Sequence, residues 1–318
     1  MYTIGIDLGG TNIAVGLCDE TLNMIDKDKV RTNAHRPASE IVRDMAMLTK
    51  SIVERNKLTE NDLEYVGILV PGTVDVVNGV VECTPNLPFS GLNLREEFKK
   101  HFPVKQILLE NDANAAAIGE LLAGAGVGVD SLVMITLGTG VGGGVIMNGK
   151  VFSGCMNSSG AELGHTVIVA NGKQCGCGRR GCWEAYSSAT ALKEMTRVRI
   201  SELKERGISS LMLDNDNVSA RTAFDAAKAG DEEGQRLVDE YIGYLAVGVT
   251  NIINIFQPEL LLIGGGVSGE GENLTRPLRE IVDREQYTKD RAVKTRIMTA
   301  TLGNDAGIIG AAGLGRVL

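Results

Sequence analysis

The N-terminal third of the chain has the pattern of one α/β unit. Short apolar runs, or runs that alternate with polar residues, predict strands, and apolar residues spaced three to four apart predict helices. The predicted strands are 2–7, 12–18, 24–31, 65–70 and 106–109. The predicted helices are 37–56, 94–101 and 112–123.

The same pattern then starts again. Strands are predicted at 131–137, 141–147, 260–263 and 294–300, and helices at 231–256 and 304–317. The polar stretch 207–219 is predicted to be an exposed loop. In both halves a glycine turn joins the first two strands, which indicates an internal repeat and two related domains with mixed sheets covered by helices.

The predicted small domain is 1–111 with 304–318, and the large domain is 112–303. A length of 318 residues suits two domains, and 43% apolar with 23% charged residues is typical of a globular protein. The formal net charge of -8, without a basic stripe, argues against nucleic acid as a partner. The N-terminus lacks the pattern of a signal peptide, and no apolar run is long enough to span a membrane, so we expect a cytoplasmic protein.

The 40 glycines are clustered, and three clusters suggest a site for phosphates. Gly9 and Gly10 free their backbone N–H groups to face an anion, Thr11 adds a hydroxyl, and Asp7 offers a carboxylate for Mg²⁺. An ordinary tight hairpin turn explains the first cluster equally well when it is taken alone. A matching turn at 138–140 and a third cluster at 264–266 favour the phosphate interpretation. A P-loop is excluded because no Gly-Lys-Ser/Thr follows.

This three-part arrangement resembles the superfamily of actin, hexokinase and the heat-shock ATPases. The resemblance implies a ribonuclease H-like fold of two domains with ATP in the cleft between them. The residues that it implies for the nucleotide are Asp7, Gly9, Gly10, Thr11, Asn12, Thr139, Gly140, Gly264, Gly265 and Gly266.

Three of the six cysteines lie close together, at Cys175, Cys177 and Cys182, and His165 precedes them. Three thiolates and one imidazole complete a tetrahedral Zn²⁺ shell with no open position, which is typical of a structural site. Segment 165–182 is therefore a predicted zinc-binding segment, and redox-active or buried thiols are the alternative.

Residues 110–115, with the sequence Glu-Asn-Asp-Ala-Asn-Ala, follow a predicted strand and open a predicted helix. Asp112 is suited to accept the proton of an attacking hydroxyl. A helix cap is the alternative, since Asn and Asp favour that position. The two roles are compatible if Asn111 caps the helix.

The segment 175–184, Cys-Gly-Cys-Gly-Arg-Arg-Gly-Cys-Trp-Glu, with Glu-Leu-Gly-His at 162–165, closely resembles the signature of the ROK family (repressor, open reading frame, kinase). The resemblance covers nearly the whole chain and is strongest to bacterial glucokinases. It implies ATP-dependent phosphorylation of a hexose, glucose first, and a homodimer or homotetramer. In such sugar kinases the aspartate that matches Asp112 is the catalytic base.

The family's sugar contacts match polar residues on both sides of the predicted zinc segment. They are Asn86, Asn111, Asp112, Glu162, His165 and Glu184. His165 has two ring nitrogens, so one is available for zinc and the other for a sugar hydroxyl. Taken alone, Asn86 also fits an ordinary turn residue and Glu184 a solvated acid of a first helical turn.

Two rival functions remain at this stage. A sugar-sensing ROK regulator carries an N-terminal helix-turn-helix, for which we see no place before the strand at residue 3, and a partner-driven ATPase does not need the zinc segment. The sugar itself is less certain than the reaction, because relatives use N-acetylmannosamine, N-acetylglucosamine, allose, mannose or fructose. Phe89, where glucokinases often carry Trp, is a departure that bears on this point.

Overall fold

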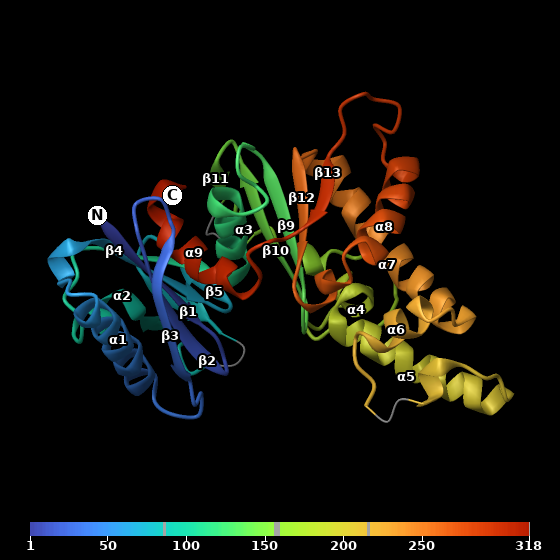
Figure 1. The fold of residues 1–318 in the computed structure, drawn as a ribbon, viewed down its shortest axis with the longest axis horizontal. Helices are drawn as coiled ribbons and strands as arrows, with labels where there is room; N and C mark the ends of the chain where they lie inside the picture. Colours follow the sequence, from blue (N-terminus) through green and yellow to red (C-terminus); the bar gives the residue numbers. More distant parts are fainter. Residues whose placement is uncertain (85–86, 156–159, 215–216, 318) are drawn as a thin grey trace. The chain divides into compact units, whose positions relative to one another are not determined.

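The structure, a computed structural model, describes residues 1–84, 87–155, 160–214 and 217–317 (Figure 1). It contains two five-stranded sheets and a small three-stranded sheet. The first sheet holds β1 (Tyr2–Leu8), β2 (Asn12–Cys18), β3 (Met24–Arg31), β4 (Leu63–Val70) and β8 (Ile107–Asn111). The second holds β9 (Leu132–Leu137), β10 (Val141–Met147), β11 (Lys150–Val151), β12 (Leu260–Gly264) and β13 (Arg296–Thr299). The small sheet holds β5 (Thr73–Asp75), β6 (Val80–Cys83) and β7 (Leu92–Asn93).

The two large sheets have the same strand order. The first runs β3-β2-β1-β4-β8 and the second β11-β10-β9-β12-β13, so in each the third, second, first, fourth and fifth strands of the set follow one another. In the first sheet β1 and β2 are antiparallel, whereas β4 lies parallel to both β1 and β8. The predicted internal repeat and the predicted α/β fold with mixed sheets are therefore confirmed.

The α-helices and short 3-10 turns connect these strands. The α-helices are α1 (Ala38–Arg55), α2 (Leu94–Lys99), α3 (Asp112–Ala123), α4 (Glu184–Ser187), α5 (Ala189–Arg206), α6 (Thr222–Lys228), α7 (Glu232–Phe256), α8 (Glu272–Glu285) and α9 (Ala306–Gly313). The 3-10 turns are Glu60–Asp62, Leu163–His165, Leu211–Asp214, Gly266–Glu270, Gly303–Asp305 and Leu314–Arg316. No helix in the described part of the chain is long and apolar enough to cross a membrane.

Contacts divide the chain into two compact units, each described by itself below. Unit 1 comprises 1–134, 144–161 and 301–318, and unit 2 comprises 135–143 and 162–300. The predicted boundaries instead placed 112–134 and 144–161 in the large domain. α3 falls in unit 1 because it packs on α9 at backbone distance: a Cβ on Gly119 would lie 2.3 Å from the carbonyl oxygen of Ala306. The domain boundaries stay a prediction.

Strand β1 sorts its side chains to two faces of the first sheet, because alternate residues of a strand point to opposite sides. Ile4, Ile6 and Leu8 join the buried core that also holds the apolar face of α1. Gly5 and Asp7 face the opposite side, where α9 packs (Figure 1). The side chain of Asp7 therefore lies on the face of the sheet that helix α9 covers.

Helix α9 approaches this face closely because glycines line the contact. A Cβ on Gly5 would lie 1.9 Å from the carbonyl oxygen of Ile308, and a Cβ on Gly67 1.9 Å from that of Ala311. Any larger side chain would force the helix away from the strands. This close packing explains why the predicted C-terminal helix is rich in Gly and Ala.

In unit 2 the long helix α7 packs around Trp183, the single tryptophan of the sequence. The indole is fully buried, its Nε1 donates to the carbonyl oxygen of Tyr244 at 3.2 Å, and Gly248 leaves room for it. Trp183 immediately precedes α4 and follows Cys182. The core of unit 2 therefore anchors the end of the predicted zinc segment.

The stretch 207–219 differs from its prediction. Leu211–Asp214 forms a 3-10 turn rather than an open loop, and the side chain of Met212 is fully buried. Asp231 accepts the backbone N–H of Leu211 at 2.5 Å, which holds the turn on the start of α7. Residues 215–216 lie outside the described ranges.

Candidate active site

The first glycine turn, at residues 9–11, is fixed by hydrogen bonds to its backbone carbonyl groups, and its tip is exposed to solvent. The N–H of Gly9 donates to the carbonyl oxygen of Asn12 at 3.0 Å. Thr32 donates its hydroxyl to the carbonyl oxygen of Gly9 at 2.6 Å and its N–H to that of Thr11 at 3.0 Å. Gly10 and Thr11 are exposed, so their donors face solvent. The turn leads from β1 into β2, as the sequence predicted, and forms a fixed rim that suits an anion.

Asp7 lies at the end of β1 in a confined place. Burial first, and then the negative charge of Asp112, together raise the pKa of its carboxyl group to about 6. A Cβ on Gly307 of α9 would lie 3.1 Å from Oδ2 of Asp7, so a larger residue there would press on this carboxylate. Asp7 and Asp112 are neighbouring carboxylates, and Asp7 is poorly hydrated. Such a pair suits a divalent cation, because Mg²⁺ prefers carboxylate oxygens as ligands.

Asn111 and Asp112 divide their roles at the start of α3. Asn111 is the N-cap, and its side-chain oxygen accepts the N–H groups of Ala113 at 2.9 Å and Asn114 at 3.5 Å. Its side-chain nitrogen donates to the carbonyl oxygen of Gly72 at 2.8 Å. Asp112 is exposed and accepts the N–H of Ala113 through Oδ1 at 2.9 Å. The capping role thus falls to Asn111, and Asp112 is the first residue at the positive end of the helix dipole.

Glu110 supports this pair, and no role was predicted for it. Its side chain is buried, and Oε1 accepts the N–H of Asn111 at 2.9 Å and the amide of Asn114 at 3.0 Å. Burial raises the pKa of Glu110. Its position as the first residue of the polar run after an apolar strand is the signal that could have identified it.

In unit 2, Glu184 lies against the second glycine turn. Its Oε2 accepts the N–H of Val141 at 3.1 Å, and a Cβ on Gly140 would lie 2.2 Å from the same oxygen. Oε1 lies 3.5 Å from Sγ of Cys175, which donates to it. The N–H of Gly138 bonds to the carbonyl oxygen of Gly140 at 3.0 Å, and Thr139 is exposed at the tip.

The third glycine cluster packs on the same turn. Gly264 ends β12, and Gly265 adopts a φ of 81° in the left-handed region that favours glycine. A Cβ on Gly265 would lie 2.6 Å from the backbone of Leu137, the last residue of β9. The structure therefore brings the second and third predicted glycine clusters together within unit 2.

The four predicted zinc ligands converge. One ligand atom from each of His165, Cys175, Cys177 and Cys182 lies within 4.8 Å of the others. Sγ of Cys175 is 3.7 Å from Nδ1 of His165, and Sγ of Cys177 is 3.7 Å from Sγ of Cys182. A tetrahedron with Zn–S bonds of about 2.3 Å has edges of about 3.8 Å, so these distances fit zinc. They are too long for a disulfide, whose S–S bond is about 2.05 Å.

The backbone around this cluster turns sharply. Gly178 and Gly181 have φ of 91° and 82°, and a Cβ on Gly181 would strike the carbonyl oxygen of Val169. Gly176 needs no such conformation. Because Nδ1 of His165 faces the thiols, its Nε2 is the nitrogen left for another partner. Glu162 is exposed just before the 3-10 turn that carries His165.

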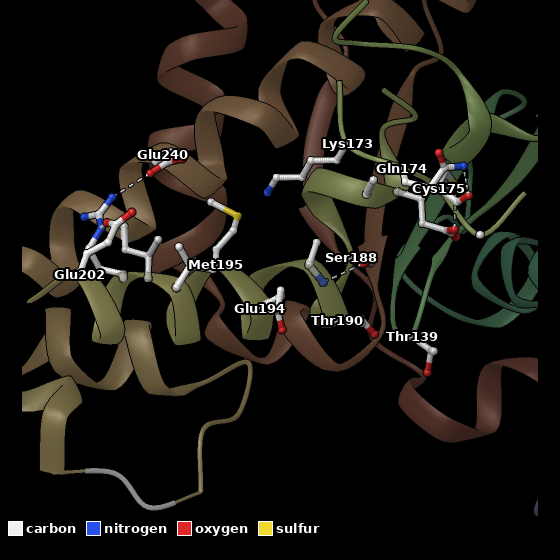
Figure 2. Close-up of a pocket in the computed structure, with 17 residues that line it drawn as sticks. Thr139, Lys173, Gln174, Cys175, Ser188, Thr190, Glu194, Met195, Glu202 and Glu240 are labelled. Carbon is white, nitrogen blue, oxygen red and sulfur yellow. Dashed lines mark hydrogen bonds and ion pairs between the residues drawn. The ribbon is translucent and has the colours of Figure 1, made fainter. Parts of the chain in front are cut away.

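A cavity of about 560 Å³ adjoins these groups in unit 2 (Figure 2). Figure 2 shows Thr139, Ser188 and Thr190 toward one end of it and Glu202 and Glu240 toward the other. Glu184 and Cys175 also line it. Its size suits a small-molecule ligand. Residues of α5 such as Thr190 and Glu194 also line the cavity, and no motif in the sequence marks them.

Asn86, one of the predicted sugar contacts, lies outside the described residues. Phe89, the departure noted above, is fully buried in the core of unit 1. Its aromatic ring therefore serves packing in this structure.

The comparisons with known proteins agree with this arrangement. The profile of the ROK family matches residues 3–316. A glucokinase of Thermotoga maritima is 40% identical over 314 residues, which are 98% of this chain and 96% of that protein. The solved structure of a ROK family glucokinase from Streptomyces griseus in complex with glucose and AMPPNP is 33% identical, covers 99% of both chains and has a TM-score of 0.80.

A ROK hexokinase from Thermus thermophilus is 30% identical, with a TM-score of 0.81 and coverage of 98% of this chain and 97% of that one. The family profile matches nearly the whole length of the chain, and these relatives are 30–40% identical to it, so the protein family is established. The chain belongs to the ROK family.

Proposed function

We propose that this chain is an ATP-dependent hexose kinase that phosphorylates glucose at the hydroxyl of carbon 6. The arrangement at the start of α3 carries the proposal. Asn111 satisfies the helix N-terminus, so Asp112 is not needed as its cap and presents an exposed carboxylate at the positive end of the helix. The similarity to glucokinases of the same length supports glucose as the first substrate.

In the proposed reaction the sugar hydroxyl oxygen forms a bond to the γ-phosphorus of ATP. The bond between that phosphorus and the β,γ-bridging oxygen breaks, and ADP leaves with the electron pair. Asp112 accepts the proton of the hydroxyl. Positioning and charge stabilisation supply most of the rate in such transfers.

The nucleotide phosphates are assigned to the two glycine turns. Gly10, Thr11 and Asn12 supply one set of donors, whereas the N–H of Gly9, expected to face the anion, is used within the turn by the carbonyl oxygen of Asn12. Thr139 with Gly140 supplies the other set, and the third cluster, 264–266, is assigned to the adenosine. Asp7 fits the Mg²⁺ that accompanies ATP, directly or through water. This cation would neutralise developing phosphate charge when bound.

The sugar is assigned to Asn111, Asp112, Glu162, His165 and Glu184, together with Asn86. The hydrogen bonds of Asn111 limit what it offers: its oxygen already accepts two N–H groups, and its amide already donates once. One N–H of that amide is left for a sugar oxygen. Nε2 of His165 is available for a hydroxyl while Nδ1 faces the thiols.

Zinc is assigned to His165, Cys175, Cys177 and Cys182. The tetrahedral fit of the ligand atoms supports this, as does the closed donor set, which leaves no position for a reacting water. The ion would hold the segment that carries His165 and precedes Glu184. Its proposed role is structural.

A panel of sugars tests the substrate. ADP release is measured with glucose, mannose, allose, fructose, N-acetylglucosamine and N-acetylmannosamine under identical Mg-ATP concentrations. We expect the highest kcat/KM with glucose. A tenfold preference for any other sugar would refute glucose while leaving the kinase proposal in place.

A further inference from the structure

Glu184 was predicted as a sugar contact, yet its carboxylate lies on the turn assigned to the nucleotide. Oε2 accepts the N–H of Val141 at 3.1 Å. The three atoms nearest to a Cβ built on Gly140 all belong to Glu184, at 2.2, 3.1 and 3.9 Å. The side chain therefore fills the space that a larger residue at position 140 would need.

A second hydrogen bond ties the other end of the same turn. The N–H of Ala189, the first residue of α5, donates to the carbonyl oxygen of Gly138 at 2.9 Å. The first N–H groups of a helix have no partner within the helix. The N–H of Ala189 finds its partner in the turn. Residues 184–189 thus hold the 138–141 turn at both of its ends.

We propose that Glu184 is a positioning residue for the nucleotide phosphates, in addition to its assignment to the sugar. By accepting the Val141 N–H it fixes the peptide that follows Gly140, and so fixes the direction of the donors at Thr139 and Gly140. The inference rests on the proposed function, because it takes these residues to bind phosphate.

Two effects of the carboxylate oppose each other and can be separated. Holding the turn favours nucleotide binding, whereas a negative charge near phosphates opposes it. Glu184→Ala removes both effects. Glu184→Gln removes the charge but keeps an oxygen that can accept the Val141 N–H, so it is the conservative variant.

The measurement is the Kd of Mg-AMPPNP by calorimetry in the absence of sugar. We expect Glu184→Ala to weaken binding by about tenfold, the size of a hydrogen bond to a charged group, and Glu184→Gln to stay within about twofold of wild type. Glu205→Ala, an exposed glutamate on α5, is the matched control and should leave the Kd unchanged. Tighter binding by both Glu184 variants would overturn the proposal, since it would show that repulsion dominates.

A double-mutant cycle tests the contact itself. Gly140→Ala should displace the Glu184 side chain and weaken nucleotide binding in the wild-type background. In the Glu184→Ala background the added methyl has room, so Gly140→Ala should have little further effect. Additive effects of the two substitutions would contradict the proposal, because the methyl would then act on the nucleotide directly.

Failure of this inference is distinguishable from failure of the proposed function. A wild-type chain that binds Mg-AMPPNP and phosphorylates sugar, with a Kd unaffected in Glu184→Ala, overturns only the positioning role. A wild-type chain that does not bind Mg-AMPPNP overturns both. Emission of the buried Trp183 reports whether each variant keeps its fold, because a disrupted neighbourhood would expose the indole.

Discussion

At the scale of single residues, the pair Asn111 and Asp112 carries the sharpest expectation. Asp112→Asn keeps the size of the side chain but removes the proton acceptor. We expect kcat to fall by at least about a hundredfold, because a positioned general base contributes about 10² to 10⁴. Steady-state ADP release at saturating glucose and Mg-ATP measures the effect.

The control for this substitution is Glu40→Gln, which removes a half-buried first-turn acid from α1. Glu40→Gln loses a favourable interaction with a helix dipole and should lose only a few tenths of a kcal/mol of stability. Asp112→Asn loses the same kind of interaction but also removes the charge that opposes Asp7, so it should lose no more than this. Near-normal turnover by a folded Asp112→Asn variant would reject Asp112 as the base.

Asp7 gives an expectation that depends on pH. Its pKa of about 6 in the folded chain lies above the usual value of 3.8, so the folded state holds this proton more tightly than the unfolded state. The cost of ionising Asp7 on folding is absent below about pH 3.8 and complete above about pH 6. Without metal or nucleotide, Asp7→Asn should therefore stabilise the protein at pH 7.5 by about 2 kcal/mol.

The measurement for Asp7→Asn is denaturant unfolding in the presence of a chelator at pH 7.5 and pH 4.5. The stabilisation should shrink strongly at the lower pH, where wild-type Asp7 is already protonated. Equal stabilisation at both values would show that the effect comes from packing rather than from the buried charge.

Sequence reasoning could choose these residues but not all of their partners. The zinc ligands stand in a short segment whose spacing is itself the signal, whereas the catalytic role of Asp112 is implied by the resemblance to ROK sugar kinases. The bond between Glu184 and Val141 joins residues 43 positions apart and depends on how α4 packs on the turn. The position of Glu110 marks it as a candidate, but its burial and its bonds to Asn111 and Asn114 are visible only in the structure.

At the scale of the elements, glycine packing of α9 sets how closely it meets its neighbours. A Cβ on Gly310 would lie 1.8 Å from the carbonyl oxygen of Ala115 in α3, so Gly310→Ala should destabilise the protein by about 2 kcal/mol or more. Gly243→Ala in α7 is the matched control, since no described atom lies within 4 Å of its added Cβ. That control should gain about 0.5 to 1 kcal/mol from helix propensity.

Thermal unfolding of both glycine variants without ligands measures this difference. Because each substitution is Gly to Ala inside a helix, the propensity gain cancels and the contact with Ala115 is isolated. A Gly310→Ala variant as stable as Gly243→Ala would mean that α9 does not approach α3 at backbone distance.

The zinc segment carries a prediction on metal content. We expect one zinc per chain, lost in Cys182→Ser and retained in Cys83→Ser, whose cysteine is exposed and outside the cluster. Chelation should also red-shift the emission of Trp183, because this buried indole adjoins Cys182. Elemental analysis and fluorescence give the two readouts, and a metal-free wild-type chain would contradict the assignment.

The elements that could be predicted are those whose pattern is local. Strands β2, β3 and β10 and helix α3 have the predicted bounds, because alternation or an asparagine cap marks their ends. We made no prediction for α5, α6 or α8, which all lie in unit 2. The 3-10 turn at Leu211–Asp214 lies in the stretch predicted as a loop, because its short apolar run, Leu-Met-Leu at 211–213, is flanked by serines and by the polar residues 214–217.

At the scale of the whole molecule, the repeat was the most informative sequence feature. Two glycine turns between strands predicted two related halves, and both large sheets have the same strand order. The domain boundaries stay a prediction, and the contacts group α3 with unit 1, where it packs on α9 from the far end of the chain. Long-range packing of this kind leaves no mark in a local pattern.

The most direct test of the account is the stoichiometry of the reaction. Wild-type protein is incubated with Mg-ATP, with and without glucose, and ADP and sugar phosphate are quantified by ³¹P NMR. We predict one hexose 6-phosphate for each ADP formed, and little ADP without sugar. ADP formed at the same rate with no phosphorylated sugar would contradict the central claim.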